Sequence, residues 1–320
     1  MDFRYLGNER LEVSELGLGC APMSRTNAPL DDDEAIRTIH RAREIGVTMF
    51  DTSDVYGASH NETLLGKAFA GDFKNVVLAT KGGSTFLPDG SRGRDGKPET
   101  AVKSCEASLT RLGLEVIDLY YLHRIDPDVP LEESVGAMAR LVEQGKVRHI
   151  GMSDLGPDEI RRAYAVHPLT ALQSEYSMFV RNVEAEVLPA CRELGISFVC
   201  YGPLWRGVLG GTYYKEQVVR KGVEDLSARR DLWEDRDREL LQPVNDIAAA
   251  HGATQAQIAI AWLLAQGDDI IPIPGTRRRK YLEENMAAAD VALSPQEVAT
   301  LNSAYPVGIA KKARKLPEPS

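Results

Sequence analysis

Short apolar segments alternate with helical segments from one end of the chain to the other, and few folds accommodate such an alternation. Segments rich in Val, Ile and Leu are expected as strands at residues 16–20, 47–51, 75–81, 116–123, 147–153, 170–176, 196–202 and 269–275. Helices are expected at residues 32–46, 61–71, 99–113, 131–146, 158–166, 184–195, 237–251, 254–266 and 279–289. Strands that lead into helices predict a parallel sheet, and apolar strands predict that both of its faces are buried. The pattern therefore predicts one (β/α)8 barrel domain over residues 1–320, with a frayed tail of about ten residues.

Two kinds of segment stand outside this alternation. FRYLG and LEVSEL precede the first strand and predict a small β-hairpin that closes the bottom of the barrel. The connections at residues 82–98 and from 204 to about 236 are unusually long, and long ordered loops at a barrel mouth usually shape the substrate pocket. The second connection carries Trp205, Tyr213, Tyr214 and Trp233, at least one of which is expected to contact substrate. The alternative is that both connections are surface insertions without a role.

The composition is that of a globular protein and argues against several partners. The chain has 43% hydrophobic and 27% charged residues, and no apolar stretch is long enough for a transmembrane helix. Its first residues are charged and lack the apolar core of a signal peptide, so a cytoplasmic protein without membrane contact is expected. The net charge of −9 argues against binding to nucleic acid. Cys20, Cys105, Cys191 and Cys200 show no metal-ligand spacing and are expected to be buried reduced thiols, with no metal site. Nothing in the sequence predicts an oligomeric state.

Four polar residues stand at or just after the ends of three consecutive expected strands. Asp51, Lys81 and His123 end their strands, and Tyr56 lies in the turn after the first of them. In a (β/α)8 barrel such positions converge on one mouth. A tyrosine hydroxyl titrates near pH ~10 in water, so its anion needs support from a neighbour before it donates a proton near neutrality.

Lys81 would supply that support, Asp51 would keep the lysine charged and aimed, and His123 would hydrogen-bond the substrate oxygen. Taken singly, the four residues also fit a turn cap, a turn aromatic, a surface-paired lysine and a core histidine. Their joint placement favours a proton-donating site.

Five segments carry a resemblance to a known family. FDTSDVYG (50–57), ATKGG (79–83), LYYLHRIDP (119–127), ALQSEYS (171–177) and IPIPGTRRRKYLEEN (271–285) resemble the aldo-keto reductases in order and spacing. The resemblance extends over essentially the whole chain and is greatest to the subgroup with LHRIDP and GTRRRKYLEEN. It implies a tetrad of Asp51, Tyr56, Lys81 and His123, in which tyrosine protonates the carbonyl oxygen as hydride arrives from NADPH.

The resemblance also implies a set of cofactor contacts along one edge of the barrel. Ser153 and Gln173 would hold the nicotinamide carboxamide, and Tyr201 would stack on the nicotinamide ring. The remaining expected contacts are Gly19, Met23, Asp51, Asp154, Gly202, Pro203, Leu204, Arg206, Gly207, Leu209, Ile273, Gly275, Thr276, Arg277, Tyr281, Glu284 and Asn285.

Two of these positions carry a chemical argument of their own. Asp154 stands where many family members have Asn, and an ionised Asp only accepts hydrogen bonds. It could take the carboxamide NH2 but could not support the carboxamide oxygen. Arg277 opens a basic run that would oppose the dipole of the following helix unless an anion sits there, and a guanidinium suits the 2′-phosphate that distinguishes NADP(H). The alternative is a solvated basic start to the helix.

The expected reaction is NADPH-dependent reduction of an aldehyde or ketone with Tyr56 as general acid. Trp205, Phe86 and Arg124 are expected to line the pocket for a small carbonyl substrate. The alternatives are the reverse reaction, as an NADP-dependent alcohol or sugar (lactol) dehydrogenase, and a non-catalytic NADP-sensing subunit, against which the complete tetrad argues. A Rossmann dehydrogenase is disfavoured because Pro22 takes the last glycine position of GLGCAP. A metal-dependent hydrolase is disfavoured because the histidines show no ligand pairing.

Overall fold

The centre of the molecule is an eight-stranded sheet in which every neighbouring pair is parallel. The computed structural model describes residues 1–24, 30–86, 92–210 and 230–309. The strand order is β3-β4-β5-β8-β9-β10-β11-β12. The strands are β3 (Leu18–Gly19), β4 (Met49–Asp51), β5 (Val77–Gly82), β8 (Ile117–Leu122), β9 (Val147–Ser153), β10 (Ala171–Glu175), β11 (Ser197–Tyr201) and β12 (Ile270–Pro272).

The two ends of this sheet meet, which makes it a barrel. The amide of Gly17 donates to the carbonyl of Pro272 at 3.0 Å, and Gly19 forms a parallel bridge with Gly275. A Cβ atom at Gly19 would lie 2.8 Å from the carbonyl oxygen of Ile273, so the closure requires glycine at that point. The predicted (β/α)8 fold is confirmed.

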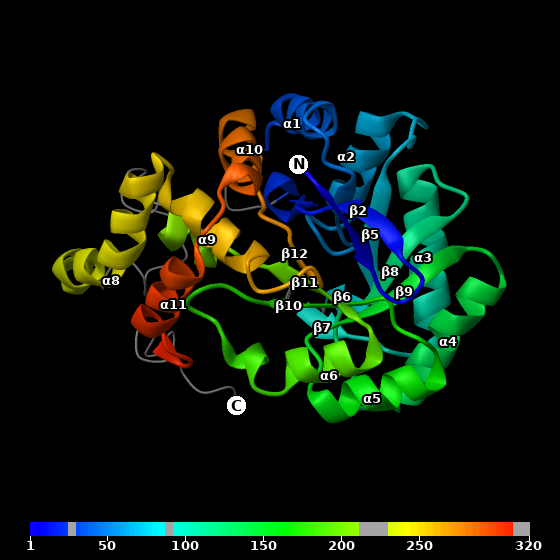
Figure 1. Cartoon of the computed structure of the whole chain (residues 1–320). Helices are drawn as coiled ribbons and strands as arrows, with labels where there is room; N and C mark the ends of the chain where they lie inside the picture. Colours follow the sequence, from blue (N-terminus) through cyan, green and yellow to red (C-terminus); the bar gives the residue numbers. More distant parts are fainter. Residues whose placement is uncertain (25–29, 87–91, 211–229, 310–320) are drawn as a thin grey trace.

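Helices surround the sheet, with α1 to α6 succeeding one another around one part of it and α8 to α11 gathered on another (Figure 1). They are α1 (Asp32–Glu44), α2 (His60–Phe69), α3 (Pro98–Leu112), α4 (Leu131–Glu143), α5 (Pro157–Val166), α6 (Val187–Leu194), α8 (Arg230–His251), α9 (Gln255–Leu264), α10 (Arg279–Met286) and α11 (Pro295–Ala304). Short 3-10 segments are η1 (Ala21–Ser24), η2 (Asn182–Glu184), η3 (Trp205–Gly210) and η4 (Ala287–Asp290). Asp31 caps α1 by accepting from the amide of Glu34 at 2.9 Å, as its position before the apolar run predicts. None of the described helices combines the length and apolarity needed to cross a bilayer.

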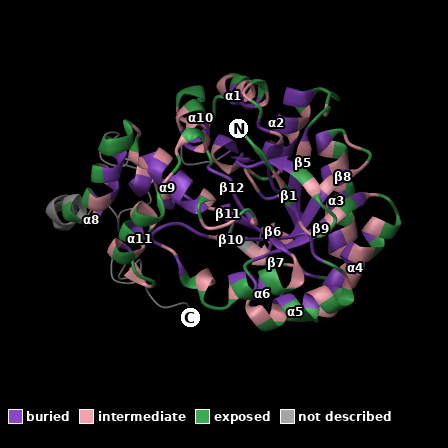
Figure 2. Cartoon of the chain, viewed as in Figure 1, coloured by how far each residue is buried: buried purple, intermediate pink, exposed green. Residues whose placement is uncertain are grey.

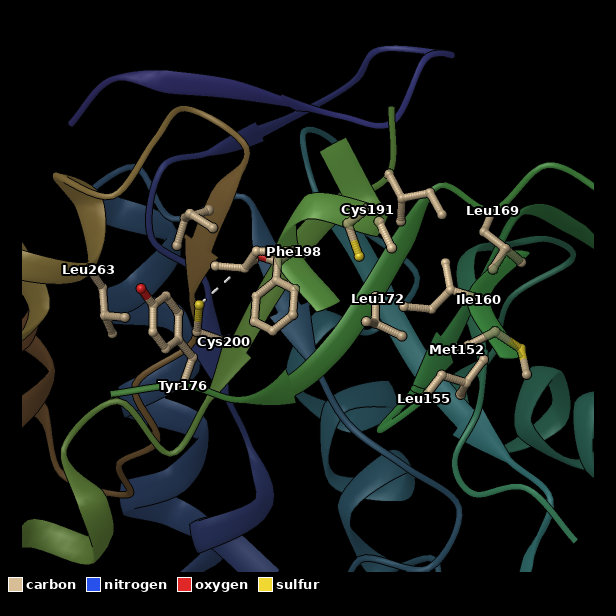
Figure 3. Close-up of a cluster of buried hydrophobic side chains, with 14 of the residues drawn as sticks. Met152, Leu155, Ile160, Leu169, Leu172, Tyr176, Cys191, Phe198, Cys200 and Leu263 are labelled. Carbon is tan, nitrogen blue, oxygen red and sulfur yellow. Dashed lines mark hydrogen bonds between the residues drawn. The ribbon is translucent and has the colours of Figure 1, made fainter. Parts of the chain in front are cut away.

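The largest hydrophobic core lies between the sheet and the helices. Leu172 of β10 pairs with Met152 of β9 and Phe198 of β11, and Ile160 of α5 and Cys191 of α6 join the same cluster (Figure 3). Buried residues follow the strands and the inner faces of the helices, while exposed residues lie on the outer faces (Figure 2). This distribution explains why the strand sequences are apolar throughout.

A second core fills the inside of the barrel, and the N-terminal hairpin closes one end of it. β1 (Phe3–Leu6) and β2 (Leu11–Ser14) pair antiparallel and add Leu6 and Val13 to the buried interior. The amides of Gly7 and Ser14 donate to the hydroxyls of Ser197 and Thr48 at the beginnings of two strands. The predicted hairpin is confirmed. The carboxyl ends of the strands, which carry the polar residues, lie at the opposite end of the barrel.

Two expected connections differ from the sequence prediction. Residues 82–98 include a short antiparallel ribbon, β6 (Ser84–Phe86) and β7 (Arg92–Arg94). Helix α8 begins at Arg230, earlier than the expected 237. The ribbon arms, STF and RGR, lack the run of apolar residues by which the other strands are identified.

Candidate active site

The strand ends bring Asp51, Tyr56, Lys81 and His123 together. Lys81 Nζ lies 2.6 Å from Asp51 Oδ1, and both side chains are almost completely buried. The same ammonium lies 5.1 Å from the centre of the Tyr56 ring. The ring centres of Tyr56 and His123 are 5.9 Å apart in an edge-to-face arrangement. The four residues thus form one cluster at the carboxyl ends of β4, β5 and β8.

Buried charge is the main electrostatic feature of this cluster. Desolvation, the largest single influence on Lys81, lowers its pKa, but the Asp51 carboxylate and Tyr56 together raise it above its ordinary value. Lys81 Nζ also donates to the backbone carbonyl of Thr52 at 2.7 Å. The ammonium is therefore held charged and oriented beside the Tyr56 ring.

Gln173 supports the carboxylate from the other side. Its Nε2 donates to Asp51 Oδ2 at 2.7 Å, so both carboxylate oxygens of Asp51 accept a hydrogen bond from a side chain. The sequence predicted Gln173 as a partner of the nicotinamide carboxamide. Its NH2 group is directed at the centre of the tetrad, and its role towards the carboxamide stays a prediction.

Arg124, Ser153, Asp154 and Tyr201 form a second polar group at the same rim. Arg124 donates to Ser153 Oγ at 2.8 Å and pairs with Asp154 Oδ2 at 2.9 Å. The hydroxyl of Tyr201 donates to that same oxygen at 3.0 Å. Asp154 has a φ of 57°, a left-handed conformation that Asp and Asn tolerate better than most residues. The aspartate therefore has a partner in Arg124, which neither residue's place in the sequence indicated.

The basic run at the start of α10 faces the acidic first turn of α1. Arg279 donates to both carboxylate oxygens of Glu34 at 3.2 Å, and its hydrogen bond holds the pKa of Glu34 down at about 2. Arg277 and Arg278 line a hollow of about 840 Å³ whose other side is formed by residues 31–34. Arg279 is thus paired with Glu34, and Arg277 and Arg278 line the neighbouring hollow.

The other expected cofactor residues lie at the same end of the barrel or on α10. Gly19 ends β3, and Met23 is buried in η1. The positions that follow β11 and β12 or lie on η3 and α10 are Gly202, Pro203, Leu204, Gly207, Leu209, Ile273, Gly275, Thr276, Tyr281, Glu284 and Asn285. Their cofactor roles stay predictions.

Of the three residues expected to line the substrate pocket, Arg124, Trp205 and Phe86, the first two differ from one another in their surroundings. Arg124 belongs to the polar group just described. Trp205 is only 5% exposed and packs edge-to-face on Phe179, with ring centres 5.1 Å apart. The side chains of Phe86, Arg206, Tyr213, Tyr214 and Trp233 lie outside the described residues.

The sequence analysis did not identify two side chains of the segment FDTSDVYG that lie next to the tetrad. Ser53 and Asp54 lie between Asp51 and Tyr56, and the hydroxyl of Ser53 is 3.1 Å from Nδ1 of His123. Their only signal in the sequence was their place in FDTSDVYG. Among the residues the structure describes, no group of His, Cys, Asp or Glu side chains is arranged to hold a metal ion.

Comparison with known proteins places this site in a family. The model of the Aldo/keto reductase family matches residues 15–306. The chain belongs to this family. A probable aldo-keto reductase 1 from Glycine max is 44% identical over 308 residues, which cover 95% of this chain and 88% of the relative. The thermostable aldo-keto reductase Tm1743, solved with the inhibitor epalrestat, is 29% identical with a TM-score of 0.77, over 95% of this chain and 100% of that one.

Family membership supports an oxidoreductase that acts on small carbonyl compounds with a nicotinamide cofactor. It agrees with the cluster of proton-donating residues at the barrel mouth.

Proposed function

We propose that this aldo-keto reductase uses NADPH to reduce an aldehyde or ketone, with Tyr56 as general acid. The observation that carries the proposal is the buried ammonium of Lys81, held between the Asp51 carboxylate and the Tyr56 ring. A cation fixed at that place stabilises a tyrosinate, and a tyrosine with a stabilised anion gives up its proton more readily.

The residues at the mouth have the chemistry that a nicotinamide dinucleotide requires. A half-buried aromatic face at Tyr201 and the hydroxyl of Ser153 lie at the ends of β11 and β9, the two strands that flank β10, as a nicotinamide ring with its carboxamide would need. Arg277 and Arg278 border the hollow at the other end of the expected binding edge, and guanidinium groups pair well with phosphate. When bound, the cofactor supplies the hydride. The proposed 2′-phosphate preference rests on Arg277, which opens the basic run and lines this hollow.

The chain's own residues then handle the proton and the orientation of the substrate. The Tyr56 hydroxyl donates its proton to the carbonyl oxygen as negative charge develops there. Lys81 stabilises the tyrosinate that remains, and Asp51 keeps Lys81 charged. His123 hydrogen-bonds the same oxygen from the side and fixes its orientation. The same groups serve alcohol oxidation in reverse, with tyrosinate accepting the proton.

A double-mutant cycle on single-turnover oxidation of NADPH tests this proposal. A panel of aldehydes, quinones, keto sugars and pyridoxal first identifies a substrate for the wild type. Tyr56→Phe keeps the ring and removes the donor, so the rate should fall by about 10²–10⁴ while NADPH binding, followed by fluorescence, persists. Lys81→Met should cause a similar loss, and the two losses should be strongly non-additive because both act through one proton.

Tyr164→Phe on α5 is the matched control, since it removes a tyrosine hydroxyl that contacts only Asn8 in the described structure. Its rate should stay at the wild-type level. Near-wild-type hydride transfer in Tyr56→Phe would show that another group, with His123 the first candidate, is the acid. A wild type that binds NADPH and turns over no carbonyl compound would favour an NADP-sensing role.

A further inference from the structure

The catalytic histidine is joined to a carboxylate through a serine. Ser53 Oγ lies 3.1 Å from His123 Nδ1 and 3.1 Å from Asp54 Oδ1. Ser53 is completely buried and His123 is 6% exposed, so the polar partners of the hydroxyl come mainly from the protein. A serine hydroxyl carries one proton and can donate to only one of these two neighbours at a time. Its next acceptor, the carbonyl of Lys81, is farther away at 3.5 Å.

Burial and one neighbouring carboxylate disfavour the ionised form of Asp54. Desolvation raises the pKa of Asp54 to about 7, and the Glu62 carboxylate adds to the rise, against smaller opposing effects of Ser53 and Arg111. Glu62 on α2 is completely buried, accepts from Thr80, and pairs with Arg111 of α3 at 2.6 Å.

Two more titratable groups complete the surroundings of Asp54. The hydroxyl of Tyr120 on β8 lies close enough for Asp54 to raise its pKa, although burial raises it more. On the side of β5, Lys81 faces Asp54 with its backbone, since its carbonyl accepts from the amide of Asp54 at 3.2 Å, while its ammonium is held by Asp51. The carboxyl therefore changes protonation near neutral pH beside the histidine of the tetrad.

The direction of the Ser53 hydrogen bond determines which nitrogen of His123 bears the proton. When Asp54 is ionised and His123 neutral, Ser53 donates to Asp54 and accepts from Nδ1–H, so Nε2 carries a lone pair. When Asp54 is protonated, it donates to Ser53, Ser53 donates to Nδ1, and the proton is on Nε2. If the extra proton resides on the ring, as imidazolium beside carboxylate, Nε2 also bears a hydrogen. In either protonated form Nε2 is a donor, and the loss of one proton to solvent turns it into an acceptor.

We propose that Ser53 and Asp54 are positioning residues that set the protonated nitrogen of His123 and so couple pH to the direction of the reaction. The inference rests on the proposed function, in which His123 contacts the substrate oxygen. We call the hydrogen-bonded chain of Asp54, Ser53 and His123 the relay. A carbonyl oxygen needs a donor, which the protonated relay supplies at Nε2. An alcohol needs an acceptor for its hydroxyl, which the deprotonated relay supplies. Reduction is favoured below about pH 7 and oxidation above it, with the midpoint belonging to the Asp54–Ser53–His123 unit as a whole.

The kinetic test measures single-turnover rates in both directions from about pH 5.5 to 9, a range that spans the neutral titration of histidine and of the relay. Wild type should show a step near pH 7, falling for reduction and rising for oxidation by about tenfold, as expected for one lost hydrogen bond to a developing charge. Asp54→Asn should remove this step. In a Ser53→Ala background the Asp54→Asn change should have no further effect, because the hydroxyl that connects the two groups is gone. Glu62→Gln should move the step to lower pH.

Asp118→Asn is the matched control. Asp118 lies near the beginning of β8, the strand whose other end leads into His123. Burial raises the pKa of Asp118, as it does that of Asp54. The kinetic step should be unchanged in this variant. A step that survives in Asp54→Asn, or one that disappears equally in Asp118→Asn, would refute the relay.

A measurement without turnover separates the relay from the reaction itself. In 15N-histidine-labelled protein, without cofactor or substrate, the His123 signals are identified by their loss in His123→Gln. Nε2 should be protonated below about pH 7 and Nδ1 above it, and Asp54→Asn should abolish the exchange of sites. If the wild type reduces no carbonyl compound, the proposed function fails and this spectrum still tests the relay. The same protonated nitrogen on both sides of the midpoint would overturn it.

Discussion

Removing one partner of the buried Asp51–Lys81 pair should destabilise the protein far more than the small change in side-chain volume suggests. Lys81 is completely buried and its ammonium is 2.6 Å from Asp51. Asp51→Asn keeps the shape and removes the charge, so the ammonium must either stay buried without its counter-ion or lose its proton. Breaking such a pair typically costs about 3–5 kcal/mol of the free energy of unfolding.

The pH dependence provides a sharper test because its sign should reverse. In the wild type the pKa of Lys81 is raised above 10.5, so its contribution to stability is present below that pH and is lost as the pH rises through the folded-state pKa. In Asp51→Asn the desolvation that lowers the pKa remains while the attraction to Asp51 is gone. The folded-state pKa then falls below the unfolded value, and the variant should gain stability as the pH rises towards about 10.

Urea unfolding at several pH values measures both effects. The double variant Asp51→Asn/Lys81→Met should lose less stability than the sum of the single variants, since it leaves no unpaired buried charge. Glu132→Gln is the control, because it removes a carboxylate from an exposed pair with Arg162 and should leave the midpoint nearly unchanged. A loss below about 1 kcal/mol in Asp51→Asn, together with an unchanged pH slope, would refute the argument.

Three further predictions follow from the rim and the sheet. Arg277→Ala should reduce affinity for NADPH about ten- to hundredfold and leave NADH affinity unchanged in parallel titrations; equal wild-type affinities for the two cofactors would contradict the assignment. Asp154→Asn should preserve the fold, since Asn also accepts its φ of 57°, and should keep or tighten NADPH binding by adding a donor; a variant that unfolds with unaltered cofactor affinity would assign Asp154 a structural role. Gly151→Ala should lower the thermal midpoint, because the added Cβ would lie 2.5 Å from the Tyr121 ring and 2.6 Å from the carbonyl of Ala171; an unchanged midpoint would show that β8 and β9 can separate there.

The barrel could be predicted from the sequence because its determinants are local. Apolar strands alternate with helices, and individual residues mark the helix ends. For α1 these are the N-cap Asp31 and Gly46, which has a φ of 93°. Strand β9 begins and ends where the sequence indicated, at Val147 and Ser153. The β6–β7 ribbon could not be predicted, since its residues carry no periodic signal and pair only with each other.

The gathering of the tetrad's strand residues could also be predicted, because side chains two residues apart on a strand lie on the same face. Asp51 pairs with Ala79 across β4 and β5, and Lys81 lies two residues farther along, on the same face of the sheet. Lys81 in turn pairs with Tyr121, and His123 again lies two residues beyond. Each step keeps the side chain on one side while advancing towards the mouth, so the three polar residues gather there.

The hydrogen-bond partners of the polar side chains at the mouth could not be predicted from strand register. Strand-end placement brings several donors and acceptors within a few ångströms, and the pairing that forms depends on the directions of the side chains. Gln173 could meet a cofactor or Asp51, and it reaches Asp51. Asp154 could meet a carboxamide or Arg124, and it reaches Arg124. A cofactor that binds at this rim must either build on these contacts or exchange them. Because exchanging a buried hydrogen bond is costlier than exchanging an exposed one, the half-buried Arg124–Asp154 pair is the one that binding should rearrange, and the buried Gln173–Asp51 contact the one that should persist.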